Sequence, residues 1–307
     1  MSSRPRIALA TCSSLPSWEH DDEPLLAALR ERGAEVAQPI WDDPSVDWSA
    51  HDLVVIRTTW DYQSKHAAFV AWAEGVAART RLLNPPAVVG WNTDKRYLRG
   101  LAAAGVPIAP SWWFAQGDSP DLAELVAAAG IVRGFVKPVV AANSRGTFRF
   151  DARDPVALAA AQASLTSMLA GEAMVLQPYL AAVEQEGELS VVVFDGAVSH
   201  AVRKVPVAGD YRVQDDFGAH DEPLAVDAEL ADLVERTLTG LAQIAAAQGW
   251  ADALPLAYAR VDVLRDGDGA LVVNELELVE PSLFFRHDSG AGARFAEVLL
   301  RRIARDR

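Results

Sequence analysis

The run from Tyr258 to Phe285 constrains the fold more than any other part of the chain. It contains two segments with the β-branched and apolar residues of strands, joined by an Asp-Gly-Asp-Gly turn, and this pattern predicts a β-hairpin. Side chains two residues apart on a strand share a face. Arg260 and Asp262 are therefore expected to point the same way, and Glu275 and Glu277 to project together from the partner strand.

This hairpin predicts a site for a divalent cation. Two carboxylates about 4 Å apart repel by roughly 4 kcal/mol at an effective dielectric of about 20, so ionised Asp262, Glu275 and Glu277 need a cation or another partner. Hard oxygen ligands on rigid strands suit Mg²⁺, which commonly shares one or two carboxylates with substrate phosphates. A solvated edge hairpin with acidic outer positions is the alternative, and the hairpin alone does not exclude it.

Length and charge limit the classes of partner. With 307 residues, 50% of them hydrophobic, the chain can bury the cores of two or three compact units. Its 28 Lys and Arg against 42 Asp and Glu give a net charge of −14, which opposes binding to nucleic acid or to an anionic membrane and favours a small-molecule partner. No apolar stretch reaches the length of a membrane span and no signal peptide is recognised, so we expect a cytoplasmic protein. Cys12 is the single cysteine, which excludes an internal disulfide and a cysteine-based zinc site.

The first ninety residues alternate strand and helix signals. Strands are predicted near residues 7–11, 35–38 and 53–56, and helices near 22–33 and from about 64. This pattern predicts a small doubly wound α/β unit. Asn84, Pro85 and Pro86 mark its exit, and a helix over residues 94–104 leads into the rest of the chain.

The remaining chain mixes strands and helices in an order typical of α+β architecture. A polar loop over residues 205–222 and a long alanine-rich helix over 227–248 precede the carboxylate hairpin. The other predicted strands cover residues 135–138, 147–151, 174–177, 189–194 and 197–204, and the other helices cover 154–169 and 293–305.

Several residues before the hairpin suit a nucleotide. Lys95 opens a helix, and Lys137 ends an apolar strand just before a loop of small residues at 141–146, whose backbone can approach an anion. The strand and linker over residues 175–180 can offer backbone groups and apolar side chains to a planar base, and Glu188 can accept a ribose hydroxyl. Taken singly, each feature also fits an ordinary helix start or strand end.

The order of these parts resembles the ATP-grasp superfamily, in its glutathione-synthetase-like and D-Ala-D-Ala-ligase-like members, over roughly residues 84–285. The resemblance implies an N-terminal small doubly wound pre-ATP-grasp domain over residues 1–91. It further implies a two-lobed ATP-grasp domain over residues 92–307, with a small lobe at about 108–174 and a large lobe at about 175–307.

The resemblance also implies the residues that hold ATP and Mg²⁺. Members usually have Asn where this chain has Glu277, so the metal site here would be more negative. The implied contacts are Lys95 and Lys137 for the phosphates, Gln177, Tyr179 and Leu180 for the adenine, Glu188 for the ribose, and Asp262, Glu275 and Glu277 for Mg²⁺.

Shorter motifs narrow the resemblance to the branch that contains the cycloserine synthetase, an O-ureido-serine cyclo-ligase. They are the segments 56–62, 200–204, 209–214 and 280–283. Arg57 and Asp61 follow a strand at the edge where doubly wound domains place ligand contacts, while packing is the alternative explanation for Trp60 and Tyr62. The predicted substrate-binding residues are Arg57, Asp61, Ser144, Glu280 and Ser282.

The resulting expectation is an ATP- and Mg²⁺-dependent carboxylate–amine ligase acting on a small amino-acid-like carboxylate. A nitrogen nucleophile would attack an acyl phosphate and release ADP and phosphate, while Arg260, Lys204 and Arg212 offset developing charge. The loop over residues 205–222 would close over the intermediate. The alternatives are ligation of two separate molecules, a kinase-like ATP-grasp enzyme and a catalytically silent nucleotide-binding protein. A homodimer or a homotetramer is compatible with this expectation.

Overall fold

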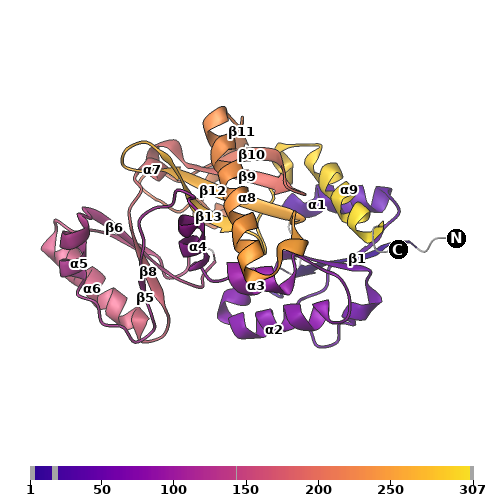
Figure 1. Ribbon diagram of the computed structural model, residues 1–307, viewed down its shortest axis with the longest axis horizontal. Coiled ribbons are helices and arrows are strands. Elements are labelled where there is room, and N and C mark those ends of the chain that lie inside the picture. The colour runs from indigo at the N-terminus through magenta and orange to yellow at the C-terminus, as the bar shows by residue number, and fades with distance from the viewer. Residues whose placement is uncertain (1–3, 16–19, 143, 305–307) are drawn as a thin grey trace.

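The residues that the structure describes form three β-sheets, each built from a different stretch of the sequence. The structure, a computed structural model, describes residues 4–15, 20–142 and 144–304. Figure 1 shows a small sheet with helices α5 (Leu122–Ala129) and α6 (Pro155–Leu169) at one end of the molecule. A larger sheet lies in the middle, and the N-terminal sheet lies at the opposite end.

The N-terminal sheet is parallel and follows the predicted strand–helix alternation. Its order is β2-β1-β3-β4, and β1 and β3 are buried along almost their whole length, as parallel strands covered on both faces are. The helix α3 was not predicted from the sequence. The elements are β1 (Arg6–Thr11), α1 (Glu23–Glu31), β2 (Glu35–Ala37), β3 (Leu53–Thr58), α2 (His66–Ala77), β4 (Leu82–Leu83) and α3 (Pro86–Asn92).

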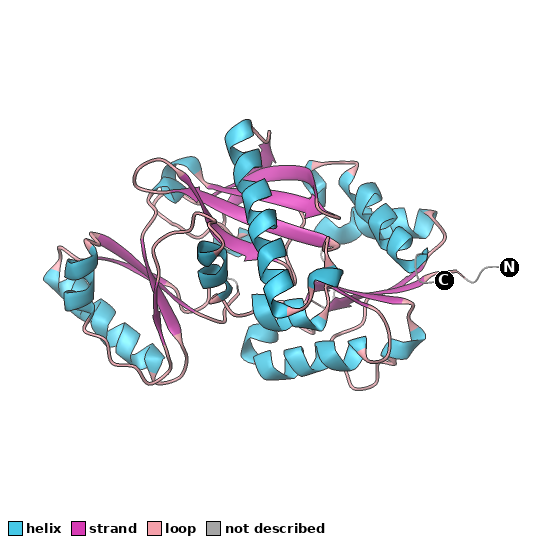
Figure 2. Ribbon diagram, viewed as in Figure 1, coloured by secondary structure: helices cyan, strands magenta, loops and turns pink. Residues whose placement is uncertain are grey.

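The small sheet is antiparallel and carries its two helices on one face (Figure 2). Its order is β5-β8-β6-β7, and its core joins the sheet to α5 and α6. β5 and α5, which are only three and eight residues long, are not predicted from the sequence. The strands are β5 (Trp112–Phe114), β6 (Arg133–Pro138), β7 (Phe148–Asp151) and β8 (Met174–Pro178).

The middle sheet is antiparallel, and the long helix α8 (Ala228–Gln248) covers one face of it (Figure 2). The Asp227 side chain caps α8 by accepting a hydrogen bond of 2.9 Å from the Leu230 amide. The order is β11-β10-β9-β12-β13, so the charged strand β12 lies between two neighbours. The other elements are α4 (Tyr97–Ala103), α7 (Ala182–Glu186), β9 (Glu188–Phe194), β10 (Ala197–Val205), β11 (His220–Leu224), β12 (Tyr258–Arg265) and β13 (Leu271–Glu277).

The last helix, α9 (Ala291–Ala304), packs on α1 of the N-terminal unit. Leu25 and Leu29 share one buried core with Phe285 and Phe295. At Gly292 an added Cβ would come within 2.7 Å of the Pro24 backbone, so only glycine permits this approach. The fold class is as predicted, α/β followed by α+β, while the domain boundaries at residues 91 and 174 stay predictions.

Short 3-10 helices fill several connections. They are η1 (His20–Asp22), η2 (Trp48–Ala50), η3 (Tyr62–Ser64), η4 (Asp215–Phe217), η5 (Ala251–Ala253) and η6 (Phe285–His287). None of the helices in the described ranges combines the length and the apolar character needed to cross a bilayer.

Candidate active site

The hairpin of β12 and β13 forms one wall of a cavity of about 330 Å³. Arg260 lies directly across from Glu277, and Asp262 lies across from Glu275. All four side chains line the cavity, as the two-residue spacing predicts. The register shifts just after Asp262, which leaves Asn274 as an extra residue in β13 that also lines the cavity.

Asp262 is buried and surrounded by donors. It accepts hydrogen bonds from Arg260 Nε and Nη2 at 2.9 and 2.8 Å and from Ser190 Oγ at 2.6 Å. Lys204 Nζ lies 3.5 Å from its Oδ2. Burial opposes ionisation, but the charges of Arg260 and Lys204 outweigh burial and hold the pKa of Asp262 below its ordinary value. Asp262 is therefore a carboxylate at neutral pH.

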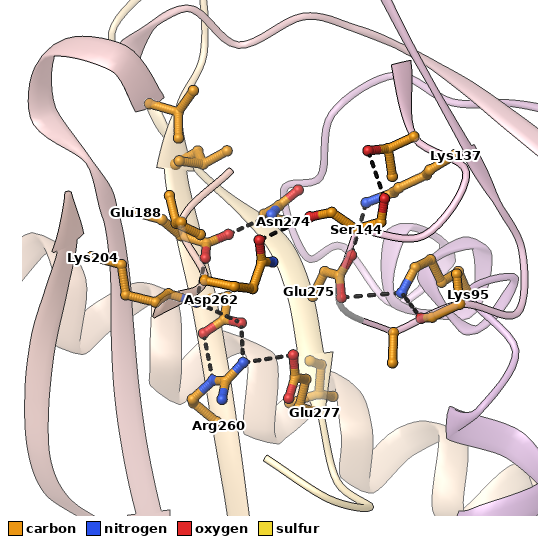
Figure 3. Close-up of a pocket in the computed structure, with 18 of the residues that line it drawn as sticks. Lys95, Lys137, Ser144, Glu188, Lys204, Arg260, Asp262, Asn274, Glu275 and Glu277 are labelled. Atoms are coloured by element: carbon orange, nitrogen blue, oxygen red, sulfur yellow. Dashed lines mark hydrogen bonds and ion pairs between the residues drawn. The ribbon is translucent and has the colours of Figure 1, made fainter. Parts of the chain in front are cut away.

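Glu275 joins three parts of the chain (Figure 3). Lys137 Nζ, from β6, lies 3.0 Å from Oε1, and Lys95 Nζ, from the turn before α4, lies 3.1 Å from Oε2. Burial works against the charge of Glu275, but the two ammonium groups lower its pKa well below the ordinary range. The two lysines predicted for the phosphates thus meet at one carboxylate of the predicted metal site.

Glu188 lies deeper in the same wall. It forms an ion pair with Lys204, its neighbour across β9 and β10, and accepts a hydrogen bond of 2.5 Å from Asn274 Nδ2. Burial raises the pKa of Glu188 in spite of the Lys204 charge.

Gln177 Nε2 donates to Ser111 Oγ at 2.9 Å. The residues predicted for the adenine, Gln177, Tyr179 and Leu180, all line the cavity together with Phe135, Tyr211 and Leu264.

Two carboxylates at the other end of the cavity are incompletely neutralised. Glu277 pairs with Arg260 at 2.6 Å, yet burial and the nearby carboxylates of Asp262 and Glu275 raise its pKa to about 7. Burial and Glu277 together raise the pKa of Glu280 to about 8, although the Tyr62 hydroxyl hydrogen-bonds to it. This corner of the cavity therefore carries more negative charge than the paired guanidinium of Arg260 offsets.

The oxygen donors of this wall are of the chemical type that Mg²⁺ prefers. Asp262, Glu275 and Glu277 present hard carboxylate oxygens from two paired strands, and the raised pKa of Glu277 shows the charge that a divalent cation would offset. No group of three or more His, Cys, Asp or Glu side chains converges on one metal position among the residues that the structure describes. Each of the three carboxylates is turned toward an Arg or Lys of the protein instead.

Arg57 and Asp61 lie outside the cavity, contrary to the prediction that they contact a substrate. The Arg57 side chain is 1% exposed and is bonded to Asp22, because the end of β3 is covered by the segment that precedes α1. Asp61 accepts a hydrogen bond of 2.7 Å from Trp41 Nε1 and pairs with Lys65. Asp61 is therefore held by partners within the N-terminal unit, while Arg57 is held by Asp22 of that unit and also donates from Nη1 to the Pro281 carbonyl at 3.1 Å.

Arg212 also differs from its prediction as a catalytic residue. Its guanidinium pairs with Asp210 and lies 3.9 Å from the centre of the Phe217 ring, outside the cavity lining. Its neighbours Tyr211 and Gln214 line the cavity instead. The remaining predicted residues, Lys95, Lys137, Ser144, Gln177, Tyr179, Leu180, Glu188, Lys204, Arg260, Asp262, Glu275, Glu277, Glu280 and Ser282, line one cavity.

The loop between β10 and β11 reaches over to the small lobe. Tyr211 Oη lies 2.9 Å from Thr147 Oγ1, and Ser144 Oγ donates to Gln214 Oε1 at 2.8 Å. These contacts bring the loop against the stretch of small residues after β6, of which Asn143 lies outside the described residues. The cavity is thus closed on this side by side chains of the β10–β11 loop and of the stretch between β6 and β7.

Some residues that line the cavity are not among the predicted site residues, and they include Trp60, Tyr62 and Asn274. The order Asn-Glu-Leu-Glu does contain Asn274, but a two-residue period assigns it to the face opposite Glu275. Only the shift of register at Asp262 brings both onto the cavity.

Comparisons with known proteins identify the family. Residues 114–280 match the RimK-like ATP-grasp domain, and residues 7–84 match the N-terminal domain of the D-cycloserine synthetase DcsG. The cycloserine biosynthesis protein DcsG of Streptomyces lavendulae is 35% identical over 301 residues, which cover 97% of this chain and 98% of that protein.

Solved structures agree with this assignment. The crystal structure of D-cycloserine synthetase DcsG has a TM-score of 0.85 at 32% identity, covering 97% of this chain and 99% of the other. A D-alanine–D-alanine ligase from Bacillus anthracis, complexed with ATP, has a TM-score of 0.67 at 16% identity, covering 99% and 98%, and so shares the fold. The chain therefore belongs to the RimK-like ATP-grasp family, in the branch of the cycloserine biosynthesis protein, and is an ATP-dependent carbon–nitrogen ligase with ATP and Mg²⁺ as cofactors.

Proposed function

We propose that this ligase activates the carboxylate of a small amino-acid-like molecule as an acyl phosphate and joins it to an amine. The observation that carries this proposal is the meeting of Lys95, Lys137 and Glu275 beside Asp262 and Glu277. Phosphoryl transfer needs cations for the phosphate oxygens and carboxylates for the metal, held rigidly side by side. This wall offers both.

The half of the cavity near the small lobe suits the nucleotide. Aromatic and apolar side chains surround it, and the strand end of β8 lies at its edge. In the proposal, Gln177, Tyr179 and Leu180 hold the adenine, Glu188 accepts a ribose hydroxyl, and Lys95 and Lys137 bind phosphate oxygens.

The carboxylates of the hairpin are proposed to hold the metal. Asp262, Glu275 and Glu277 would bind Mg²⁺, which when bound offsets the charge of the phosphates. Arg260 lies between Asp262 and Glu277 and donates from Nη1 to the Ser282 carbonyl at 3.1 Å. This position suits a guanidinium that stabilises charge on the acyl phosphate and on the tetrahedral oxyanion. Lys204 supports the same region from β10.

The other half of the cavity is proposed for the amino-acid-like substrate. It is lined by Trp60 and Tyr62 from the N-terminal unit and by Glu280, Ser282 and Arg286. A carboxylate and a guanidinium in one chamber match a substrate that carries both an amine and a carboxylate. Arg57 and Asp61 are not part of this contact set.

A single substrate that closes into a ring is the favoured reaction. Support comes from the similarity to D-cycloserine synthetase along 97% of the chain, including the N-terminal unit that contributes Trp60 and Tyr62. An O-substituted serine derivative is the substrate class that this similarity suggests. We place the reaction in the cytoplasm, where ATP is available, and the homodimer or homotetramer stays a prediction that sedimentation velocity checks.

Product analysis tests the proposal. The enzyme is incubated with ATP, Mg²⁺ and amino acids or their O-substituted derivatives, first singly and then in pairs. We expect ADP and phosphate in equal amounts with one new amide bond, and a single O-substituted amino acid should suffice. AMP and pyrophosphate would contradict an acyl phosphate, and a stable phosphorylated product without an amide would indicate a kinase. If product formed only when two different amino-acid substrates were present, the reaction would be intermolecular ligation and not ring closure.

A further inference from the structure

The segment that follows β13 is held by side chains rather than by regular structure. Residues 278–284 belong to no helix or strand, yet most of them are buried. Each main-chain carbonyl from Leu278 to Leu283 accepts a hydrogen bond from a different side chain. The donors, in order, are Asn84 Nδ2 (2.8 Å), Tyr258 Oη (2.7 Å), Trp60 Nε1 (3.0 Å), Arg57 Nη1 (3.1 Å), Arg260 Nη1 (3.1 Å) and His200 Nε2 (2.8 Å).

This arrangement ties the path of the segment to both units of the protein. Arg57, Trp60 and Asn84 come from the N-terminal unit, and the other donors come from the middle sheet. A buried carbonyl without a partner costs about 1–3 kcal/mol, so losing one donor favours another path for the segment. The segment in turn carries the side chains of Glu280 and Ser282 to the cavity.

Arg57 is the donor with the most constrained surroundings. Its Nε and Nη2 donate to the two oxygens of Asp22 at 2.9 and 2.8 Å, and its Nη1 donates to the Pro281 carbonyl. Both charged side chains are 1% exposed. The planar fork of arginine satisfies these partners at once, whereas a lysine ammonium is a point charge that cannot reproduce the bidentate geometry.

Stability alone gives a poor account of this pair. A buried ion pair often contributes no more than apolar side chains of the same volume would, because removing both charges from water is costly. The pair instead fixes an orientation. Asp22 orients the Arg57 guanidinium, and the guanidinium orients the Pro281 carbonyl. Pro281 lies between Glu280 and Ser282, the two polar residues of the segment that line the cavity.

We propose that Arg57, oriented by Asp22, is a positioning residue that holds Pro281 and thereby sets Glu280 and Ser282 toward the substrate. The proposal rests on the proposed function in one respect, that these two side chains meet the amino-acid-like substrate. Arg57 itself touches neither substrate nor nucleotide. The N-terminal unit therefore acts on the substrate half of the cavity through a backbone carbonyl as well as through Trp60 and Tyr62.

Steady-state kinetics of two variants test the proposal. Arg57→Lys keeps the charge but loses the fork, and Arg57→Met with Asp22→Leu removes both charges at similar volume. In both we expect KM for the amino-acid substrate to rise ten-fold or more, while KM for ATP stays within two-fold. A purely structural role would instead lower the amount of active enzyme, and so kcat, with both KM values unchanged. That result would overturn the proposal. If the double variant does not fold, the KM values of Arg57→Lys alone test the proposal.

Hydrogen exchange tests the same proposal without turnover. Amides of residues 278–280 and 282–284 should exchange ten-fold or more faster in Arg57→Lys than in the wild type, with β9 unchanged. Arg302→Lys is the matched control, because Arg302 also pairs with an aspartate, Asp195, and donates to a proline carbonyl, that of Pro255. Unchanged exchange over 278–284 in Arg57→Lys would overturn the positioning role. A wild type that ligates no amino acid would defeat the proposed function and leave this measurement standing.

Discussion

Lys137 of the small sheet reaches across to Glu275 of the middle sheet, with its Nζ 3.0 Å from Oε1. The ammonium proposed for a phosphate and the carboxylate proposed for Mg²⁺ are thus partners of each other. Binding of Mg²⁺ and ATP would exchange these partners, the lysine turning to a phosphate and the carboxylate to the metal. Such an exchange leaves no buried charge unpaired, and an unpaired buried charge would be costly.

Lys137→Met and Lys95→Met should weaken ATP binding. Each lysine is proposed to make a charge-assisted hydrogen bond to phosphate, so each loss should cost about 1–3 kcal/mol, or roughly 5- to 150-fold in Kd. Isothermal titration calorimetry measures this directly. Lys65→Met is the control, because Lys65 pairs with Asp42 and Asp61 away from the cavity. Unchanged affinity in both cavity variants would contradict the assignment.

Asp262→Asn and Glu275→Gln should abolish ligation without unfolding the protein. Each change keeps the shape of the side chain and removes one proposed metal ligand, so ADP release should fall by about 100-fold or more, the scale on which electrostatic groups act in catalysis. Circular dichroism checks the fold. Glu229→Gln, at the exposed start of α8 where it pairs with Arg265, should keep full activity. Normal ATP consumption in either variant would contradict the assignment of the hairpin to the active site.

Glu280 should make the stability of the free protein depend on pH. Burial raises its pKa from 4.5 to about 8, so within this window the folded state holds a proton that the unfolded state has released. The free energy of unfolding therefore falls as pH rises. Glu280→Gln stays neutral and should escape this fall. Relative to the wild type, the variant should gain at least about 1.4 kcal/mol, the equivalent of one pKa unit, between about pH 5 and about pH 8.5. Urea unfolding at a series of pH values measures the difference, and parallel curves would contradict the prediction.

Tyr211→Ala should uncouple ATP hydrolysis from ligation. The Tyr211 hydroxyl bonds to Thr147, and its ring packs edge-on against Phe135 at 5.3 Å, which closes the cavity between the lobes. Without this contact, water should reach the acyl phosphate. We expect the ratio of ADP to amide product to rise several-fold, measured by chromatography of both. The exposed Val207→Ala on the same loop should keep a ratio near one.

The hairpin was predictable from the sequence because its signals are local. Alternation of apolar and charged residues places Arg260, Asp262, Glu275 and Glu277 on one face, and an Asp/Gly turn closes the strands. The lysines and the nucleotide segment were found from their order along the chain. Most of the residues predicted from the hairpin, the lysines and the nucleotide segment line one cavity in the structure.

The partner of Arg57 was not predictable in the same way. An arginine at the end of a parallel strand can face a ligand or a distant side chain, and only the fold shows that each of its three nitrogens donates to Asp22 or to Pro281. Similarly, the periodicity of β13 gives no sign of the extra residue Asn274. The three-residue strand β5 is too short for a periodic pattern to identify.

The packing of α9 on α1 has a consequence for recombining such enzymes. A chimera that exchanges only the first 84 to 91 residues with a relative would cut through a core to which Phe285, Phe295 and Leu299 contribute. Its two halves would meet across unmatched apolar surfaces. The transferable cassette is discontinuous: it consists of the N-terminal unit together with α9, and a graft of substrate preference between relatives should carry both pieces.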